Sequence, residues 1–213
     1  MPFGTRMADQ QRHTTQLQLA EAQEALLGYV LATGRLPCPA DPSVASTHGT
    51  AGMARTPPCT GNLSAGVLPW VTLGLRETDV WGNRLSYRVS SDFADAIDSS
   101  TWGGCTPDQR PLHASFALCS TATLDILAIA GGTTLAIDVP AVIISHGANG
   151  AGAYTQQGTQ TPRGNNGDEL ENSDHGANLN YVWHPPGPGF DDQVVWLSNP
   201  LLMSRMVAAG VLP

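Results

Sequence analysis

The residues best suited to chemistry are oxygen donors gathered in one acidic, amide-rich segment, NNGDELENSD at Asn165–Asp174. Calcium binds about six to eight such hard oxygens in proteins, backbone carbonyls included. The spacing differs from that of an EF-hand loop, so the alternative is a solvated acidic loop whose Asp and Asn residues form turns. The ligands that we predict for calcium are Asp168, Glu171 and Asp174. Further oxygens come from Glu169, Asn172 and the downstream FDD at Phe190–Asp192.

Histidines supply a second candidate, a transition-metal or hydrolytic site. The chain has no H-E-x-x-H motif, and all six histidines fall in segments that we predict as loops or termini. Solvent-facing side chains are therefore the simpler interpretation, and a metallohydrolase is the least favoured alternative. Its members would be His146, His175, His184, Asp174, Asp191 and Asp192.

Neither a nucleophile nor a nucleotide site is evident in the sequence. The chain has no G-x-S-x-G motif. Ser145 and His146 are neighbours at the end of a predicted strand, where adjacent side chains point to opposite faces. The Gly-rich segment Gly147–Gly152 follows that strand, but it has no Walker lysine and no helical pattern after it. We therefore predict that the protein is not an enzyme.

Four cysteines, Cys38, Cys59, Cys105 and Cys119, form no C-x-x-C motif, which disfavours a zinc ribbon or a thioredoxin-like site. Four cysteines allow three connectivities. The local pairs Cys38–Cys59 and Cys105–Cys119 would each close a short loop, and we predict both as disulfides. Disulfides place the domain in an oxidising compartment, and the alternative is four buried thiols in a cytoplasmic protein.

The composition favours a loop-rich globular domain. Hydrophobic residues make up 41% of the chain, charged residues only 13%, and there are 23 glycines and 16 prolines. The net charge is −8, and the ten Lys and Arg residues are scattered, so we expect no nucleic-acid partner. The apolar runs fall well short of the roughly 20 residues that span a bilayer.

One long amphipathic helix is the element around which the domain must be built. We predict it over residues 14–34, with Gly34 closing it and Pro37 and Pro39 preventing its continuation. Residues at spacings of three and four give it one apolar face, which needs a sheet to pack on. The residues of that face are Leu19, Ala22, Leu26, Leu27 and Val30.

The rest of residues 13–213 is predicted as a loop over 35–66, a sheet region over 67–198 and a C-terminal helix over 200–210. Apolar runs and turn signals predict strands at 85–89, 112–118, 124–130, 135–137, 141–145 and 192–197. In the first of these, Leu85, Tyr87 and Val89 alternate with polar residues, which predicts a half-buried strand. A long helix followed by antiparallel strands predicts an α+β fold.

Five segments also occur in the order known from one protein family. They are ALLGYVLATGRLPCP at Ala25–Pro39, GVLPWVTLGL at Gly66–Leu75, DVWGNRLSYRV at Asp79–Val89, VIISHGANGAG at Val142–Gly152 and FDDQVVWLS at Phe190–Ser198. No segment is specific alone. The ordered set spans nearly the whole chain from Gln16 on, and it resembles bacterial type IV pilins and type II secretion pseudopilins.

The resemblance implies a structural subunit, a minor pilin or pseudopilin, that acts through protein–protein assembly. Such proteins begin with an apolar membrane segment of the Gly-Phe-Thr-Leu-Ile-Glu type, which is absent here. Residues 1–12 would then be foreign to the natural protein or flexible, and the alternative is a natural start at Met1 or Met7. The partners would be other pilin or pseudopilin subunits and the inner-membrane assembly machinery. The protein would occupy the inner membrane with a periplasmic domain and then enter a filament.

The resemblance also bears on calcium. Major pseudopilins carry calcium in a loop after a Ser-x-Gly-Ala-Asp/Asn-Gly pattern, which Ser145–Gly150 matches. The family's acidic ligands follow soon after this pattern, whereas here a polar insertion at Ala151–Arg163 intervenes. The main alternative to a pilin-like subunit is a periplasmic calcium-dependent ligand-binding module that uses the Asp168–Asp174 loop.

Overall fold

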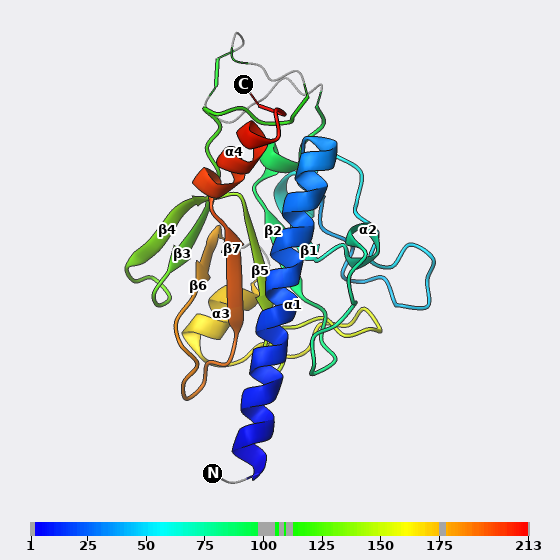
Figure 1. Cartoon of the computed structure of the whole chain (residues 1–213). Coiled ribbons are helices and arrows are strands. Elements are labelled where there is room, and N and C mark those ends of the chain that lie inside the picture. The colour runs from blue at the N-terminus through cyan, green and yellow to red at the C-terminus, as the bar shows by residue number, and fades with distance from the viewer. Residues whose placement is uncertain (1–2, 98–104, 107–108, 110–112, 175–177, 213) are drawn as a thin grey trace.

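The computed structural model describes residues 3–97, 105–106, 109, 113–174 and 178–212. Three layers stack on one another: helices, a four-stranded sheet and a three-stranded sheet (Figure 1). The helical layer contains the long N-terminal helix α1 (Phe3–Thr33) and the C-terminal helix α4 (Asn199–Ala208). The α+β class, the long N-terminal helix and the short C-terminal helix are as the sequence predicts.

Helix α1 begins at Phe3, well before the predicted start near Thr14. Residues such as Met7, Ala8 and Gln10 favour helix, and extending an existing helix adds one hydrogen bond per residue without a new nucleus. The helix ends as predicted, because Gly34 takes the left-handed conformation, with φ of 74°, and its N–H bonds to the Val30 carbonyl.

The predicted apolar face of α1 is buried in the main core. Leu19, Leu26 and Val30 are fully buried, and Ala22 and Leu27 complete the stripe. They pack on the four-stranded antiparallel sheet, whose order is β1-β2-β5-β7. The strands are β1 (Ala65–Val67), β2 (Ser86–Val89), β5 (Ala141–Ser145) and β7 (Gln193–Leu197).

The second sheet covers the other face of the first. It contains β3 (Leu124–Leu127), β4 (Thr134–Val139) and β6 (Asn180–Val182), in the order β4-β3-β6. The predicted strands at 124–130 and 135–137 correspond to β3 and β4, which form an antiparallel hairpin, whereas β6 was missed and pairs parallel to β3. Its three residues are too few to show a periodicity, and their partner lies far away in the sequence.

Because both faces of the central sheet are covered, β2 is buried on both sides, and the predicted half-buried strand was wrong. Tyr87 and Val89 face the core under α1. On the opposite face, Ser86 contacts His146, and Arg88 interacts with the buried Tyr181 of β6. Polar residues in an alternating strand are therefore covered here by polar partners rather than by water.

The strand predicted over 112–118 is not formed: residues 113–118 are irregular, and residue 112 lies outside the described residues. Ala114 and Phe116 are buried in the core below the end of α1, and the Phe116 ring stacks on Phe93 at 4.7 Å. Apolar residues thus enter the core from an irregular segment. Further helical elements of the described residues include the 3₁₀ turns Gly61–Ser64 and Ser91–Ala94 and the short helices α2 (Trp70–Leu73) and α3 (Gly167–Ser173).

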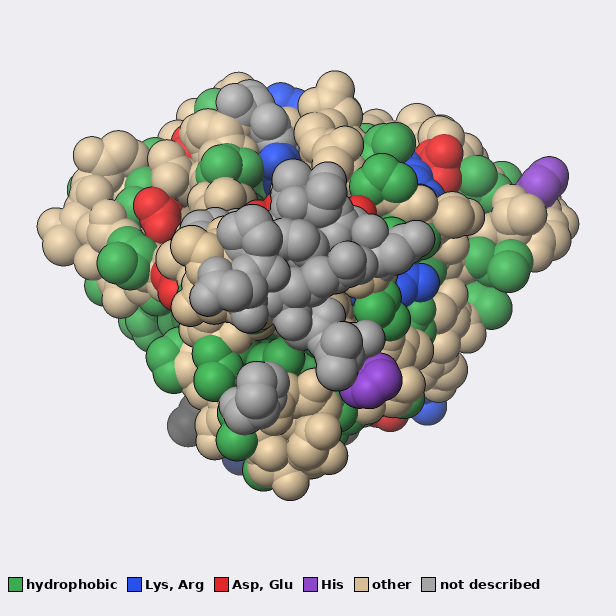
Figure 2. Space-filling model, turned by 90° about the horizontal axis from the view of Figure 1, so that it is seen from above, with side chains coloured by type: hydrophobic (Ala, Val, Ile, Leu, Met, Phe, Trp, Pro, Cys, Tyr) green, Lys and Arg blue, Asp and Glu red, His purple; other side chains and the backbone are tan. Residues whose placement is uncertain are grey.

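Both predicted disulfides are present, Cys38–Cys59 and Cys105–Cys119. The first staples the irregular part of the predicted loop 35–66, and β1 begins within the last residues of that loop. Among the described helices, none is both long and apolar enough to cross a membrane. On the face seen in Figure 2, Lys and Arg side chains lie singly rather than in a patch.

Candidate metal centre

Three carboxylates meet at the end of the central sheet where β7 begins. Glu169 lies in the first turn of α3, and Asp191 and Asp192 directly precede β7. One oxygen from each of the three lies within 4.8 Å of the others. Glu169 and Asp192 are only 3% exposed, so two of the three charges are almost removed from water.

Local hydrogen bonds position the helix that carries Glu169. The Asn166 side chain accepts from the Asp168 N–H at 2.8 Å and caps α3 at its N-terminus. Asn172 lies three residues after Glu169, hence on the same side of the helix. Its amide donates to Asp192 Oδ2 at 2.8 Å and to the Val182 carbonyl at 3.0 Å, which ties α3 to both β6 and the acidic pair.

The turn after β5 closes the site from the other side. Asn149 donates from its side chain to Glu169 Oε1 at 2.7 Å and from its backbone to Asp191 Oδ2 at 3.0 Å. Gly147 has φ of 60°, and a Cβ there would lie 2.4 Å from the Asp191 carbonyl oxygen. The turn therefore needs glycine to approach the acidic residues this closely.

The electrostatics of this cluster favour a positive ion. Burial raises the pKa of Glu169 and of Asp191, and the neighbouring charge of Asp192 raises both further. In the described part of the structure, Asp191 Oδ1 and Asp192 Oδ1 are buried without a hydrogen-bond donor. A bound cation would supply a partner for Asp191 Oδ1 and a further one for Asp192 Oδ1, which lies 3.7 Å from His146 Nδ1. A donor set made only of oxygens fits a hard cation rather than a zinc-type ion.

The ligands predicted from sequence do not form this cluster. Asp168 accepts from the Ala130 N–H at 2.7 Å and contacts His184 Nε2 at 3.2 Å, while Glu171 accepts from Asn178 at 2.8 Å. Asp174 lies beyond the end of α3. The segment is a helix rather than a loop, so its acidic side chains point in different directions. The cluster is formed instead by Glu169 and the Asp pair of FDD, which the sequence indicated only as further oxygen donors.

The two described histidines of the alternative site, His146 and His184, contact different carboxylates. His146 is fully buried, with Nε2 2.8 Å from Ser86 Oγ and Nδ1 3.7 Å from Asp192 Oδ1. His184 pairs instead with Asp168, and His175 lies outside the described residues. Ser145 donates to Asp79 Oδ2 at 2.6 Å, so it and His146 take different partners, as their strand position predicts.

Ser86, His146 and Asp192 follow the order of a hydrolytic triad. All three side chains are buried, with Ser86 only 3% exposed. A nucleophile must reach a substrate carbonyl, and burial between two sheets keeps a substrate from this hydroxyl. The arrangement is better suited to joining β2, β5 and the acidic cluster through polar contacts.

Comparisons of the chain with protein-family models, with curated proteins and with solved structures found no match.

Proposed function

We propose that this protein is a structural subunit, a minor pilin or pseudopilin, of a bacterial type IV pilus or type II secretion pseudopilus. The observation that carries the proposal is the division of α1 into two halves. The second half holds the buried stripe from Leu19 to Val30, whereas the first half extends beyond the body of the protein (Figure 1). Arg6, Met7 and Asp9 on that first half are exposed.

A helical segment that projects from the domain lacks the tertiary packing that would stabilise it in a monomer. Isolated helical segments are marginal in water, and tertiary packing supplies most helical stability in proteins. Packing against helices of neighbouring subunits would supply it in a filament. The five ordered segments that resemble pilins support the same assignment, and the two disulfides suit the periplasm. The partners would then be other subunits and the inner-membrane assembly machinery, and the protein would have no catalytic activity.

Photo-crosslinking in the native host tests this assignment. A photoreactive residue in place of His13, exposed on the projecting half of α1, should yield adducts with other pilin-like subunits. The same residue in place of Thr159, exposed on the polar insertion, serves as the matched control and should yield fewer. Folded, disulfide-bonded protein that gives no adduct from His13 in cells assembling the filament would overturn the proposal.

We further propose calcium as the ion of the Glu169, Asp191 and Asp192 cluster. The support is a buried, oxygen-only donor set with two carboxylate oxygens that have no donor in the described structure. Calcium would join α3, the turn after β5 and the start of β7. It would hold these three segments together and so order this end of the domain for assembly.

Thermal unfolding with calcium, and with excess chelator, tests the ion and its ligands. A ligand that binds only the folded state raises the midpoint by mass action. We expect calcium to raise the midpoint of the wild type but not that of Glu169→Gln. Glu171→Gln, a residue of the sequence-predicted set, is the matched control and should keep the calcium response. An unchanged midpoint in the wild type, or a response lost only in Glu171→Gln, would refute this ligand set.

A further inference from the structure

Apart from the acidic cluster, the structure contains a polar pocket where two irregular segments meet. It has a volume of about 230 Å³, and its walls include Asp41, Arg55, Asn62 and Tyr154. Asp41 and Arg55 belong to the long loop 35–66, and Tyr154 belongs to the polar insertion 151–163. The sequence marks both segments as unusual, and neither supplies a residue of the Glu169, Asp191 and Asp192 cluster.

The two segments are fixed to each other by a buried arginine. Arg84 is fully buried and donates to the carbonyls of Pro42 at 3.0 Å and Gln156 at 3.2 Å. Its backbone N–H donates to the Tyr154 carbonyl at 2.9 Å. The loop and the insertion therefore share one anchor, which makes the pocket between them a built feature rather than a chance gap.

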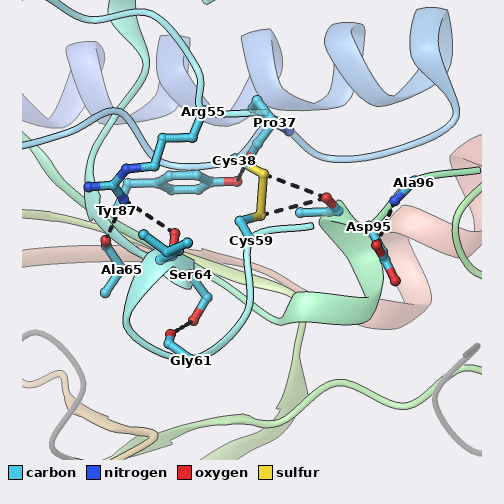
Figure 3. The surroundings of a disulfide bond; sticks show 12 residues. Pro37, Cys38, Arg55, Cys59, Gly61, Ser64, Ala65, Tyr87, Asp95 and Ala96 are labelled. Atoms are coloured by element: carbon cyan, nitrogen blue, oxygen red, sulfur yellow. Dashed lines mark hydrogen bonds between the residues drawn. A yellow bond between two sulfur atoms is a disulfide. The ribbon is translucent and has the colours of Figure 1, made fainter. Parts of the chain in front are cut away.

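The polar groups of the pocket are held in place before any ligand binds. Asp41 Oδ1 accepts from the backbone and the hydroxyl of Ser43, at 2.9 and 2.6 Å. Arg55 Nη1 donates to the carbonyls of Leu63 and Ala65, at 3.3 and 3.1 Å. Figure 3 shows Arg55 and its hydrogen bond to Ala65, together with the Cys38–Cys59 disulfide that closes the loop carrying Arg55. Such preorganisation lowers the entropic cost of binding.

The charges of the pocket select a neutral ligand. Arg55 Nη2 lies 3.8 Å from Asp41 Oδ1, so the site contains one cation and one anion side by side. A simple anion would meet Asp41, and a simple cation would meet Arg55. Hydroxyl groups both donate and accept, so vicinal hydroxyls can bind the carboxylate, the guanidinium and the Asn62 amide together.

An aromatic wall completes the site. Tyr154 is half-buried and packs against the small apolar cluster that contains Ala40 and Val67, while it also lines the pocket. An aromatic side chain beside planar polar groups offers an apolar surface to the C–H groups of a sugar ring. The floor at Gly66 must lack a side chain, because a Cβ there would lie 2.4 Å from the Ala40 carbonyl oxygen.

We propose that the pocket between Asp41, Arg55, Asn62 and Tyr154 binds one neutral sugar residue, such as the terminal residue of a glycan. A pocket of this volume has room for a single pyranose ring and its hydroxyl groups. Few contacts are made to so small a ligand, so affinity for a free monosaccharide lies in the millimolar range. The residues that line the pocket include none of the metal cluster.

Amide NMR titration of the disulfide-bonded protein tests the site with the methyl glycosides of galactose, mannose and N-acetylglucosamine. We expect at least one of them to cause saturable shifts in the amides of Asp41–Ser43, Arg55 and Tyr154. Asp41→Asn should weaken that binding by about tenfold, the cost of one hydrogen bond to a charged group, and Asn62→Ala by about two- to tenfold, the cost of one neutral hydrogen bond. Asn62 is exposed, so its variant keeps the fold intact.

Arg76→Met is the matched control, since Arg76 is an exposed arginine outside the pocket, and it should bind as the wild type does. Glycine, a small zwitterion, is the competing probe and should cause no saturable shift. Three results would overturn the proposal. They are the lack of saturable shifts with every glycoside, equal binding by Asn62→Ala and the wild type, and binding of glycine at these amides instead of a sugar.

Discussion

Arg84 Nη2 lies 2.8 Å from Glu77 Oε1, and the arginine of this ion pair is fully buried while the glutamate side chain is 18% exposed. The arginine Nε donates to the same oxygen at 2.9 Å, and the guanidinium lies 4.8 Å from the centre of the Trp70 ring. With its bonds to Pro42 and Gln156, this one side chain joins three irregular segments to the start of β2.

Replacing Arg84 with methionine should therefore lower the free energy of unfolding by about 3–5 kcal/mol, because one partner of a buried pair is removed. Urea unfolding followed by tryptophan fluorescence measures the change. Arg76→Met removes an exposed arginine from the same stretch and should change the free energy by less than about 0.5 kcal/mol. Equal midpoints and slopes for the two variants would show that Arg84 does not hold the segments together.

Helix α1 offers a matched pair of leucines for testing its packing. Leu26 is fully buried against the sheet, and Leu17 on the same helix is 59% exposed. Leu26→Ala should lower the free energy of unfolding by about 2–5 kcal/mol through lost burial and the cavity that remains. Leu17→Ala should change it by less than about 0.5 kcal/mol. Chemical denaturation of both variants measures these changes. A similar loss in each would mean that the buried face of α1 has been assigned wrongly.

The Cys38–Cys59 disulfide closes a loop with a sequence separation of 21 residues. In the chain-entropy account, such a link stabilises the protein by about 3 kcal/mol by restricting the unfolded state. We expect the double variant Cys38→Ala with Cys59→Ala to unfold at a correspondingly lower urea concentration. Retention of the wild-type midpoint would mean that the loop is ordered by Arg84 and its partners alone.

The burial of Asp79 leads us to expect that the stability of the protein depends on pH. Burial raises the pKa of Asp79 above its ordinary value of about 4, although Ser145 and two backbone N–H groups donate to it. The folded state thus holds this proton more tightly than the unfolded state, so ionisation of Asp79 opposes folding. The free energy of unfolding should fall as the pH rises from about 4 through the folded pKa, relative to Asp79→Asn, which cannot ionise.

Denaturant unfolding of the wild type and Asp79→Asn between about pH 4 and about pH 8 measures this difference. Asp9→Asn, at an exposed position on α1, is the control and should show no such trend. A wild type that gains stability over Asp79→Asn as the pH rises would mean that the hydrogen bonds outweigh the cost of burial.

Local patterns in the sequence predicted the elements that depend on neighbours in the chain. The spacing of Leu19, Leu26 and Val30 is a property of one helix, so it identified the buried face without knowledge of what covers it. Short loops between cysteines likewise favoured the pairs Cys38–Cys59 and Cys105–Cys119. Strand β2 was found from the alternation of Leu85, Tyr87 and Val89 with polar residues, and β5 and β7 were found from short apolar runs.

Tertiary structure alone decided the features made by distant segments. The metal cluster combines Glu169 of α3 with Asp191 and Asp192 before β7, and no local spacing reports which acidic side chain points at another segment. The same holds for β6, whose parallel pairing with β3 gives the short strand its identity. Arg84 is charged, and charged residues are rarely fully buried unless they are paired. Only the converging segments around it supply the partners that make its burial stable.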